Sequence, residues 1–276
     1  MRVSISIIIT MALAAGMVAF SSCRKPAPAG QDSAVAEIEA SDSLPPQVKL
    51  LVKAVAESDS GAFAALVSYP LTRPYPLRDI ADSVQMRHYF TRLVDDSLRQ
   101  VITTAVPSDW GEYGWRGWTV RNGEYLWIDD TLYDIEYVSA SEAGERSRLI
   151  DQEISSLPEP MRSGWRPVVC MRADDGKSVY RIDSRPGPAD TEIYRLAIYD
   201  TDSVEQRAPA LVLTGHKETE GSASLTTYYF SDENGGKALY EAELADSDVP
   251  RLSFTMNGKT TVVNVRKIYW RDLLHR

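Results

Sequence analysis

Residues 110–129, WGEYGWRGWTVRNGEYLWID, decide the fold of the first half of this chain. The stretch holds four of the six tryptophans, and the pair Asn122-Gly123 lies in its middle. An Asn-Gly pair between apolar alternations is a strong signal for a two-residue hairpin turn, because both residues tolerate positive φ. Such a turn places Trp118 opposite Trp127. One face of the expected hairpin then carries Arg116, Trp118, Val120, Tyr125, Trp127 and Asp129.

This aromatic face is the candidate binding site of the sequence. Trp118, Tyr125 and Trp127 can stack a flat or sugar-like ligand, with Arg116 and Asp129 at the edge. The face can instead pack on a helix, with Arg116 and Asp129 as an ion pair, or form a protein interface. Packing on a helix is the most common use of such an aromatic stripe, and the two binding uses remain as alternatives.

Composition and charge narrow the class of protein. A chain of 276 residues exceeds the usual size of one domain. With 43% apolar and 25% charged residues it has the composition of a folded protein. Its net charge is −9, and it has no basic cluster. Nucleic acid is therefore not an expected partner, since phosphate neutralisation supplies most of that affinity.

The first 46 residues read as a leader and a tether. Residues 1–22 combine one early positive charge with an apolar run, which is typical of a signal peptide. Phe20-Ser21-Ser22-Cys23 resembles the lipobox of bacterial lipoproteins, in the relaxed form of Bacteroidetes. The resemblance implies cleavage before Cys23, lipidation of Cys23 and anchoring in a membrane. Residues 23–46, rich in Ala, Pro and Ser, indicate a flexible tether.

The residues that follow Cys23 indicate which membrane would hold the lipid anchor. Arg24-Lys25 follow it, so neither an Asp nor an acidic run comes next. By resemblance to other lipoproteins, this favours the outer membrane, with the protein facing the periplasm. Cys170 is then the second and last cysteine, so no internal disulfide is expected and its thiol should be buried in a strand.

Residues 47–157 are predicted to fold as an α+β domain. Helical spacing of apolar residues indicates helices around Val48–Val55, Phe63–Val67, Val84–Val94 and Leu98–Ile102, and Asp82 with Gln85 forms a capping pair for the third. Residues 71–77 contain two prolines and should be an extended loop. After the hairpin come an alternating strand with Tyr133, Ile135 and Tyr137, and a polar helix over 142–157 whose buried side carries Leu149, Ile150, Ile154 and Leu157.

This order of elements resembles the NTF2-like (cystatin-like) fold. The motifs that carry the resemblance are Tyr69-Pro70-Leu71, the helix around Phe90 and GWRGWTVRNGEYLWID, which are similar to a group of Bacteroidetes-type lipoproteins. The resemblance implies a helix held in a curved antiparallel sheet, with a pocket at its mouth. It implies no particular activity, because this fold hosts many.

Residues 158–166 are expected to be a connector, and 167–276 a second, antiparallel β domain. Short strands separated by turn signals predict a sandwich or a small barrel. Asn257-Gly258 marks a second hairpin that pairs Phe254 with Thr261 and Leu252 with Val263. The expected strands are 167–171, 178–183, 192–200, 210–215, 225–231, 238–244, 252–256, 260–265 and 267–270.

The sequence offers no catalytic centre. His88, His216 and His275 occur in three different contexts, and metalloprotease, nucleophile-elbow and P-loop motifs are missing. Acidic pairs such as Asp129-Asp130 do not extend into a calcium-binding series. We therefore predict no catalytic residue, no metal site and no cofactor.

The function expected from these features is that of a lipid-anchored envelope protein that binds a protein or glycan partner without catalysis. Two alternatives belong to other classes. One is an envelope inhibitor of a lysozyme-like enzyme, since periplasmic inhibitors of that kind have a comparable eight-stranded shape. The other is a pocket enzyme of the NTF2-like isomerase or dehydratase kind, which needs His88 or a carboxylate with a shifted pKa in the pocket.

Overall fold

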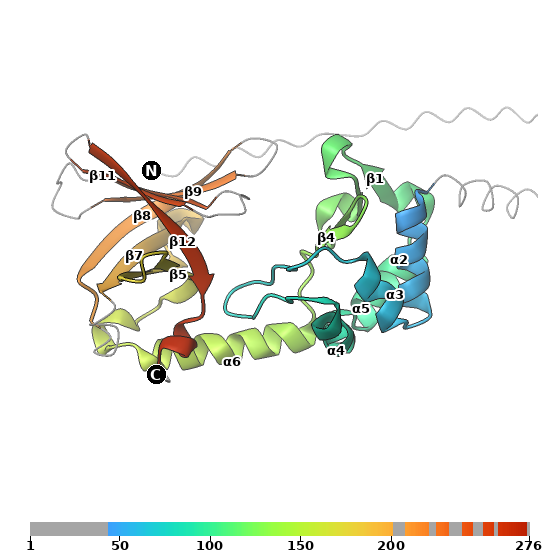
Figure 1. Ribbon diagram of the computed structural model, residues 1–276, viewed down its shortest axis with the longest axis horizontal. Coiled ribbons are helices and arrows are strands. Elements are labelled where there is room, and N and C mark those ends of the chain that lie inside the picture. Colours follow the sequence, from blue (N-terminus) through green and yellow to red (C-terminus); the bar gives the residue numbers. More distant parts are fainter. Residues whose placement is uncertain are drawn as a thin grey trace, which may run out of the picture. The chain divides into compact units, whose positions relative to one another are not determined.

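The structure is a computed structural model that describes residues 44–200, 208–220, 225–231, 239–244, 251–256 and 259–274. The expected signal peptide, Cys23, almost all of the tether and His275 lie outside these residues. Within them the chain combines α-helices with antiparallel sheets, so the predicted α+β class is confirmed (Figure 1).

Four helices begin the described chain: α2 (Pro46–Ala56), α3 (Ser60–Leu66), α4 (Ser83–Leu93) and α5 (Asp96–Thr104). An aspartate caps each of the last three, because Asp59, Asp82 and Asp95 accept hydrogen bonds from backbone N–H groups of the first turn. The predicted capping pair is present in part: Asp82 accepts from the Gln85 N–H at 2.8 Å, but the Gln85 side chain accepts from the Ala81 N–H at 3.1 Å and not from that of Asp82. Local sequence thus fixes where these helices begin.

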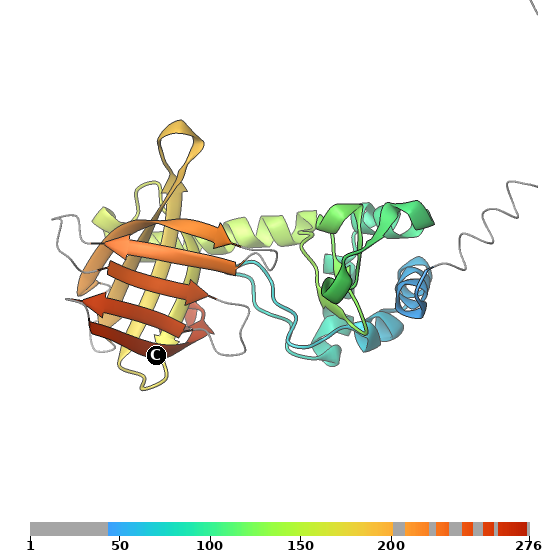
Figure 2. The same ribbon diagram turned by 90° about the horizontal axis from the view of Figure 1, so that it is seen from above.

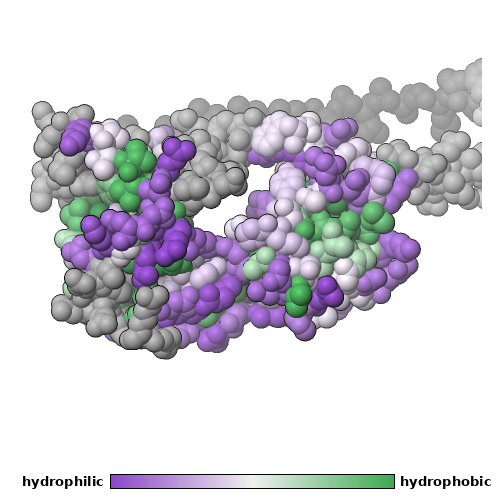
Figure 3. Space-filling view, viewed as in Figure 1, coloured by the Kyte–Doolittle hydropathy of each residue, from purple (hydrophilic) through white to green (hydrophobic). Residues whose placement is uncertain are grey.

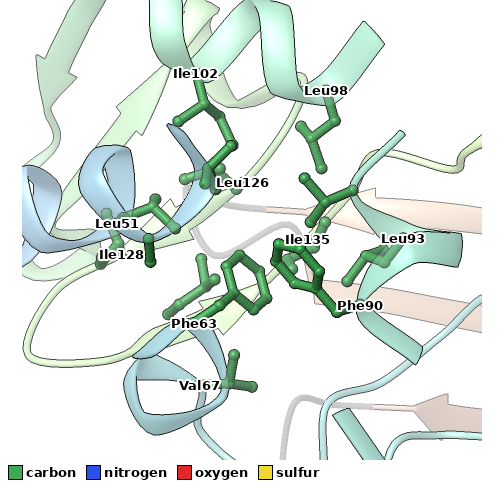
Figure 4. Packing of buried hydrophobic residues seen from close by; sticks show 14 of the residues in the cluster. Leu51, Phe63, Val67, Phe90, Leu93, Leu98, Ile102, Leu126, Ile128 and Ile135 are labelled. Carbon is green, nitrogen blue, oxygen red and sulfur yellow. The ribbon is translucent and has the colours of Figure 1, made fainter. Parts of the chain in front are cut away.

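A small antiparallel sheet follows, in the order β1 (Trp110–Glu112), β2 (Trp118–Val120), β3 (Trp127–Ile128) and β4 (Leu132–Asp134). The helices and this sheet enclose one apolar core. Figure 4 shows side chains from α2 to α5 converging with Leu126, Ile128 and Ile135, and all three of these are nearly fully buried. The strands are two or three residues long, so the sheet is held mainly by this core.

The aromatic hairpin turns at the predicted place, but the predicted register is wrong. Trp118 pairs with Ile128, and Thr119 pairs with Trp127. Residues 121–123 form a single 3-10 turn in which φ is 49° at Arg121, 58° at Asn122 and 90° at Gly123. The turn therefore holds one residue more than a two-residue loop. A slip of one residue reverses the face of every later side chain. Trp127 and Trp118 therefore lie on different faces of the hairpin, and not on the same face as predicted.

The helix predicted over 142–157 is α6 (Ala140–Ser156). Ser139 and Glu142 form a capping box at its start. The predicted Leu149, Ile150 and Leu157 are buried, whereas Ile154 is only partly buried. Two carboxylates, Glu142 and Glu153, are buried as well. The helix contacts α4 and β5 (Figure 1).

Eight antiparallel strands then form a closed barrel in chain order, in which the last strand pairs with the first (Figure 2). Of the two arrangements expected for these strands, the structure has the barrel. The two expected strands at 260–265 and 267–270 are one continuous strand. The strands are β5 (Arg166–Ala173), β6 (Ser178–Pro186), β7 (Glu192–Asp200), β8 (Leu211–Glu220), β9 (Leu225–Ser231), β10 (Leu239–Leu244), β11 (Arg251–Met256) and β12 (Lys259–Ile268).

The second Asn-Gly hairpin has the predicted register. Leu252 pairs with Val263 and Phe254 pairs with Thr261, as a two-residue loop at 257–258 requires. The loop residues themselves are outside the described residues. The register predicted from an Asn-Gly pair is therefore right at 257–258 and wrong at 122–123.

Strand β6 is buried on both faces. One face carries Tyr180 and Ile182 in the barrel core, and the other carries Val179, Arg181 and Asp183. That second face is covered by Leu157 and by the short helix η7 (Trp270–Leu273), in a cluster that includes Cys170. Cys170 is fully buried in β5, which confirms the expectation for its thiol.

Among the described residues, none of the helices has both the length and the apolar character that a membrane-crossing segment needs. The face of the molecule in Figure 3 is largely hydrophilic.

Candidate binding pocket

A cavity in the described part of the chain has a volume of about 690 Å³. We call it the acidic pocket. Its lining comes from segments far apart in the sequence, namely residues 72–75, Trp115, residues 133–136, residues 168–169 and Lys267. Its volume lies in the range of pockets that bind small molecules.

Two carboxyl groups line the pocket, beside the cations Arg73 and Lys267, which each form an ion pair with another carboxylate. Asp134 and Glu136 flank the buried Ile135, and their side chains share a hydrogen bond. Burial raises the pKa of Asp134 to about 6, and the charge of Glu136 and the shared hydrogen bond add to the shift. Two carboxylates in contact repel each other, so the pair holds one proton more readily than an isolated carboxyl does.

Two aromatic rings lie at the opening. Trp115 is 74% exposed and Tyr133 is 40% exposed, which is unusual for such large side chains. Trp115 belongs to the 3-10 turn η2 (Gly114–Arg116), which joins β1 to β2. Gly117 ends this turn at φ 72°, where a Cβ atom would lie 2.6 Å from the Ile128 carbonyl oxygen. The turn therefore carries Trp115 to the opening of the pocket.

Arg116 supports this aromatic rim from behind. Its guanidinium carbon lies 5.4 Å from the ring centre of Trp115 and 5.3 Å from that of Trp127. The Tyr133 hydroxyl donates a hydrogen bond to the Arg116 carbonyl oxygen at 2.9 Å. The two exposed rings are thus tied to one residue.

The segment 72–75 forms the opposite wall and is held by buried ionic contacts. The Arg73 guanidinium makes two hydrogen bonds of 2.8 Å to the Glu142 carboxylate, and both side chains are fully buried. It also donates to the carbonyl oxygens of Ile135 and Tyr137, at 2.5 and 2.7 Å. Arg73 therefore holds the chain around the acid pair in place.

A second buried network lies at Tyr75, two residues further along this wall. The Tyr75 hydroxyl donates to the Glu153 carboxylate at 3.0 Å, and Glu153 also accepts from Arg181 at 3.0 Å. Arg181 and Arg195 both bind Asp183. Burial alone disfavours a charged guanidinium, but Asp183 and Glu153 outweigh it and raise the pKa of Arg181. The network holds two cations and two anions.

The five residues predicted to bind a ligand lie mostly outside the acidic pocket. Trp118 and Tyr125 pack against the apolar core, and Tyr125 stacks on Tyr137 with ring centres 5.7 Å apart. Trp127 packs edge-on against Tyr113. Asp129 is exposed, and within the described residues no ion pair joins it to Arg116. Only Arg116 comes close to the pocket, as the support of Trp115.

Sequence reasoning missed the residues that line the pocket. Trp115 was assigned to the opposite face of the hairpin, and Asp134 and Glu136 lie in an alternation that indicated only a strand. The two prolines of 71–77 did mark a loop, but it contains a turn, closed by a hydrogen bond from the Leu77 N–H to the Pro74 carbonyl oxygen, instead of being extended throughout. Residues 72–75 of this loop are the wall. Nothing local indicates that these parts meet.

The histidines give the pocket no base among the described residues. His88 is exposed on α4, and His216 is exposed on β8, 3.2 Å from Glu218. In the described part of the chain, no three His, Cys, Asp or Glu side chains lie close enough to bind a metal ion. No protein-family model, curated protein or solved structure matches this chain.

Proposed function

We propose that this chain is a binding protein of the cell envelope and that the acidic pocket binds a glycan without catalysis. The observation that carries the proposal is the exposed Trp115, held beside Tyr133 at the opening of a 690 Å³ cavity. Exposed aromatic rings gathered at one cavity are typical of ligand-binding sites, and both of these rings line it.

The chemistry of the pocket favours a polyhydroxylated ligand. Aromatic faces stack on the apolar faces of sugar rings, and carboxylates accept hydrogen bonds from sugar hydroxyls. The two cations in the lining already form ion pairs, since Arg73 binds Glu142 and the Lys267 ammonium lies 2.7 Å from Asp79. The groups that face a ligand are thus the two rings and the acid pair.

The test is calorimetric titration with a panel of neutral and amino-sugar oligosaccharides. Trp115→Ala should abolish binding and leave the fold unchanged, because Trp115 is mostly exposed. The matched control is Val84→Ala, which removes an exposed apolar side chain of α4 that does not line the pocket. Binding that survives Trp115→Ala would refute the role of this pocket.

A second candidate function is a pocket enzyme in which Asp134 acts as a general acid. One observation favours it: the pKa of Asp134 is raised to about 6, near the operating pH of an enzyme. The two proposals separate on Asp134→Asn. For an enzyme this variant binds the oligosaccharide but forms no product, whereas for a binding protein the parent chain forms none either.

The anchor and the location are proposed from sequence alone. Cys23 and its lipobox-like context support lipidation, and the absence of an Asp after it supports the outer membrane, facing the periplasm. Metabolic labelling with an alkynyl fatty acid should mark the parent chain and not Cys23→Ala. Labelling of both proteins would contradict this proposal.

The finer description of the fold is also a proposal. Helices followed by an antiparallel meander, together with Tyr69-Pro70-Leu71 and the tryptophan hairpin, support an NTF2-like relationship for 47–157 and a separate β domain over 167–276. Expression of 47–157 alone tests it, since a separate domain should unfold cooperatively by itself.

A further inference from the structure

A second cavity lies on α6, away from the acidic pocket, and has a volume of about 480 Å³. We call it the arginine-rimmed cavity. Ile150 and Ile154 of α6 form one side, and Trp165 forms the other. Ile150 and Trp165 are nearly fully buried, so the floor is apolar.

Trp165 is held in a fixed position by two arginines. The guanidinium carbons of Arg185 and Arg195 each lie 4.5 Å from its ring centre. Arg195 is itself bound to Asp183 and to the Met161 carbonyl oxygen. The apolar floor is therefore preformed, which lowers the entropy lost when a ligand binds.

The rim carries more positive than negative charge. Arg162 and Arg166 line the cavity, with Asp151 as the carboxylate among its lining residues. Arg162 forms an exposed ion pair with Glu159 at 3.2 Å, whereas Arg166 has no ion-pair partner within the described residues.

A further arginine precedes the cavity on α6. Arg146 lies one turn before Ile150 on α6, and its Nε donates to the Tyr75 carbonyl oxygen at 2.9 Å. Burial and the nearby charge of Arg166 lower the pKa of Arg146. Arg146 does not line the cavity, but its charge and that of Arg166 repel each other, so an anion bound at Arg166 would reduce this repulsion.

We propose that the arginine-rimmed cavity binds a small organic anion that carries a carboxylate or phosphate on an apolar body. Guanidinium groups match both headgroups with paired hydrogen bonds. The apolar floor takes the body of the ligand, and the volume suits a small molecule. This site is independent of the acidic pocket, whose free groups are carboxylates.

The proposal is tested by isothermal titration calorimetry of the full chain with decanoate and decyl phosphate. Decanoate represents a free fatty acid and decyl phosphate a lipid headgroup, so the tighter binder identifies the source of the ligand. Acetate keeps a headgroup without the body, and decyltrimethylammonium keeps the body with the opposite charge. We expect both decyl anions to bind more tightly than either control.

Three variants locate the site. Arg166→Gln should weaken binding by about tenfold or more, because it removes a charged hydrogen-bond donor. Asp151→Asn should strengthen binding, because it removes the negative charge at the cavity. Arg148→Gln is the matched control, since Arg148 is an exposed α6 arginine that pairs with Glu145 and does not line the cavity.

The results separate cleanly. Binding of either decyl anion that weakens in Arg166→Gln, strengthens in Asp151→Asn and is unchanged in Arg148→Gln supports the proposal. Added salt should weaken this binding, since the contact is ionic. Absence of binding by both decyl anions, equal binding of decyltrimethylammonium, or binding unaffected by Arg166→Gln would overturn it.

Discussion

Replacement of Glu153 by glutamine tests the buried network between α6 and the barrel. Glu153 accepts hydrogen bonds from Tyr75 and Arg181, and the Glu153 and Arg181 side chains are almost fully buried. The neutral amide leaves Arg181 with Asp183 alone, and Asp183 also serves Arg195. The network then holds two cations and one anion.

The expected loss follows from this imbalance. Breaking a buried ion pair on one side costs about 3–5 kcal/mol, because the remaining charge stays in a low-dielectric site. A glutamine oxygen still accepts from Tyr75, so that hydrogen bond adds little to the loss. We expect the free energy of unfolding to fall by about 3–5 kcal/mol, against a typical total of about 5–15 kcal/mol.

The measurement is urea unfolding followed by tryptophan fluorescence, at about pH 8. Burial raises the pKa of Glu153 even though Arg181 opposes it, and an alkaline buffer keeps the carboxylate ionised. The matched control is Glu159→Gln, which neutralises an 87% exposed carboxylate and should cost at most about 1 kcal/mol.

A double variant makes the reasoning refutable. Glu153→Gln with Arg181→Met leaves Arg195 and Asp183 as one balanced pair, so it should be about 2 kcal/mol more stable than Glu153→Gln alone. A loss below about 1 kcal/mol in Glu153→Gln, or a double variant less stable than the single one, would show that charge balance does not hold this interface.

Three further predictions concern single residues. The folded-state pKa of Asp134 is raised to about 6 from an ordinary 3.8. This group therefore stabilises the fold fully below pH 3.8, and that contribution is lost as the pH rises through 6. A carboxyl NMR titration should show a midpoint near 6, and a midpoint near the ordinary value contradicts the acid pair. Gly117→Ala should lower the free energy of unfolding by about 1–3 kcal/mol, since φ is 72° and the new Cβ meets Ile128 and Asp129. Gly144→Ala in α6 meets no atom within 4 Å and should raise the free energy of unfolding by about 0.5–1 kcal/mol. Urea unfolding of both variants checks the difference, and equal shifts would argue against the turn geometry. Burial raises the pKa of the Cys170 thiol and keeps reagents away from it, so a maleimide should label this residue only in denaturant. Peptide mass spectrometry measures the labelling, and labelling in buffer alone would mean that the barrel opens there.

The two Asn-Gly hairpins show how far local sequence reaches. On either side of 257–258 the strands have the expected pairs. At 122–123 the dipeptide gives a turn of three residues with positive φ, and the register moves by one. There the core accepts Trp118 and Ile128 on the same side, so packing of the whole helical part decides between two registers that are similar locally.

The sequence by itself determined the elements that depend on near neighbours. Helix starts follow from capping aspartates, barrel strands from period-two alternation, and burial of Cys170 from its place in an apolar strand. Only the tertiary structure decided the sites. Arg73 meets Glu142 across 69 positions, Arg181 meets Glu153 across 28, and Trp115 comes to the same cavity as Asp134 and Lys267. Such contacts depend on how complete elements pack, and no local propensity specifies them.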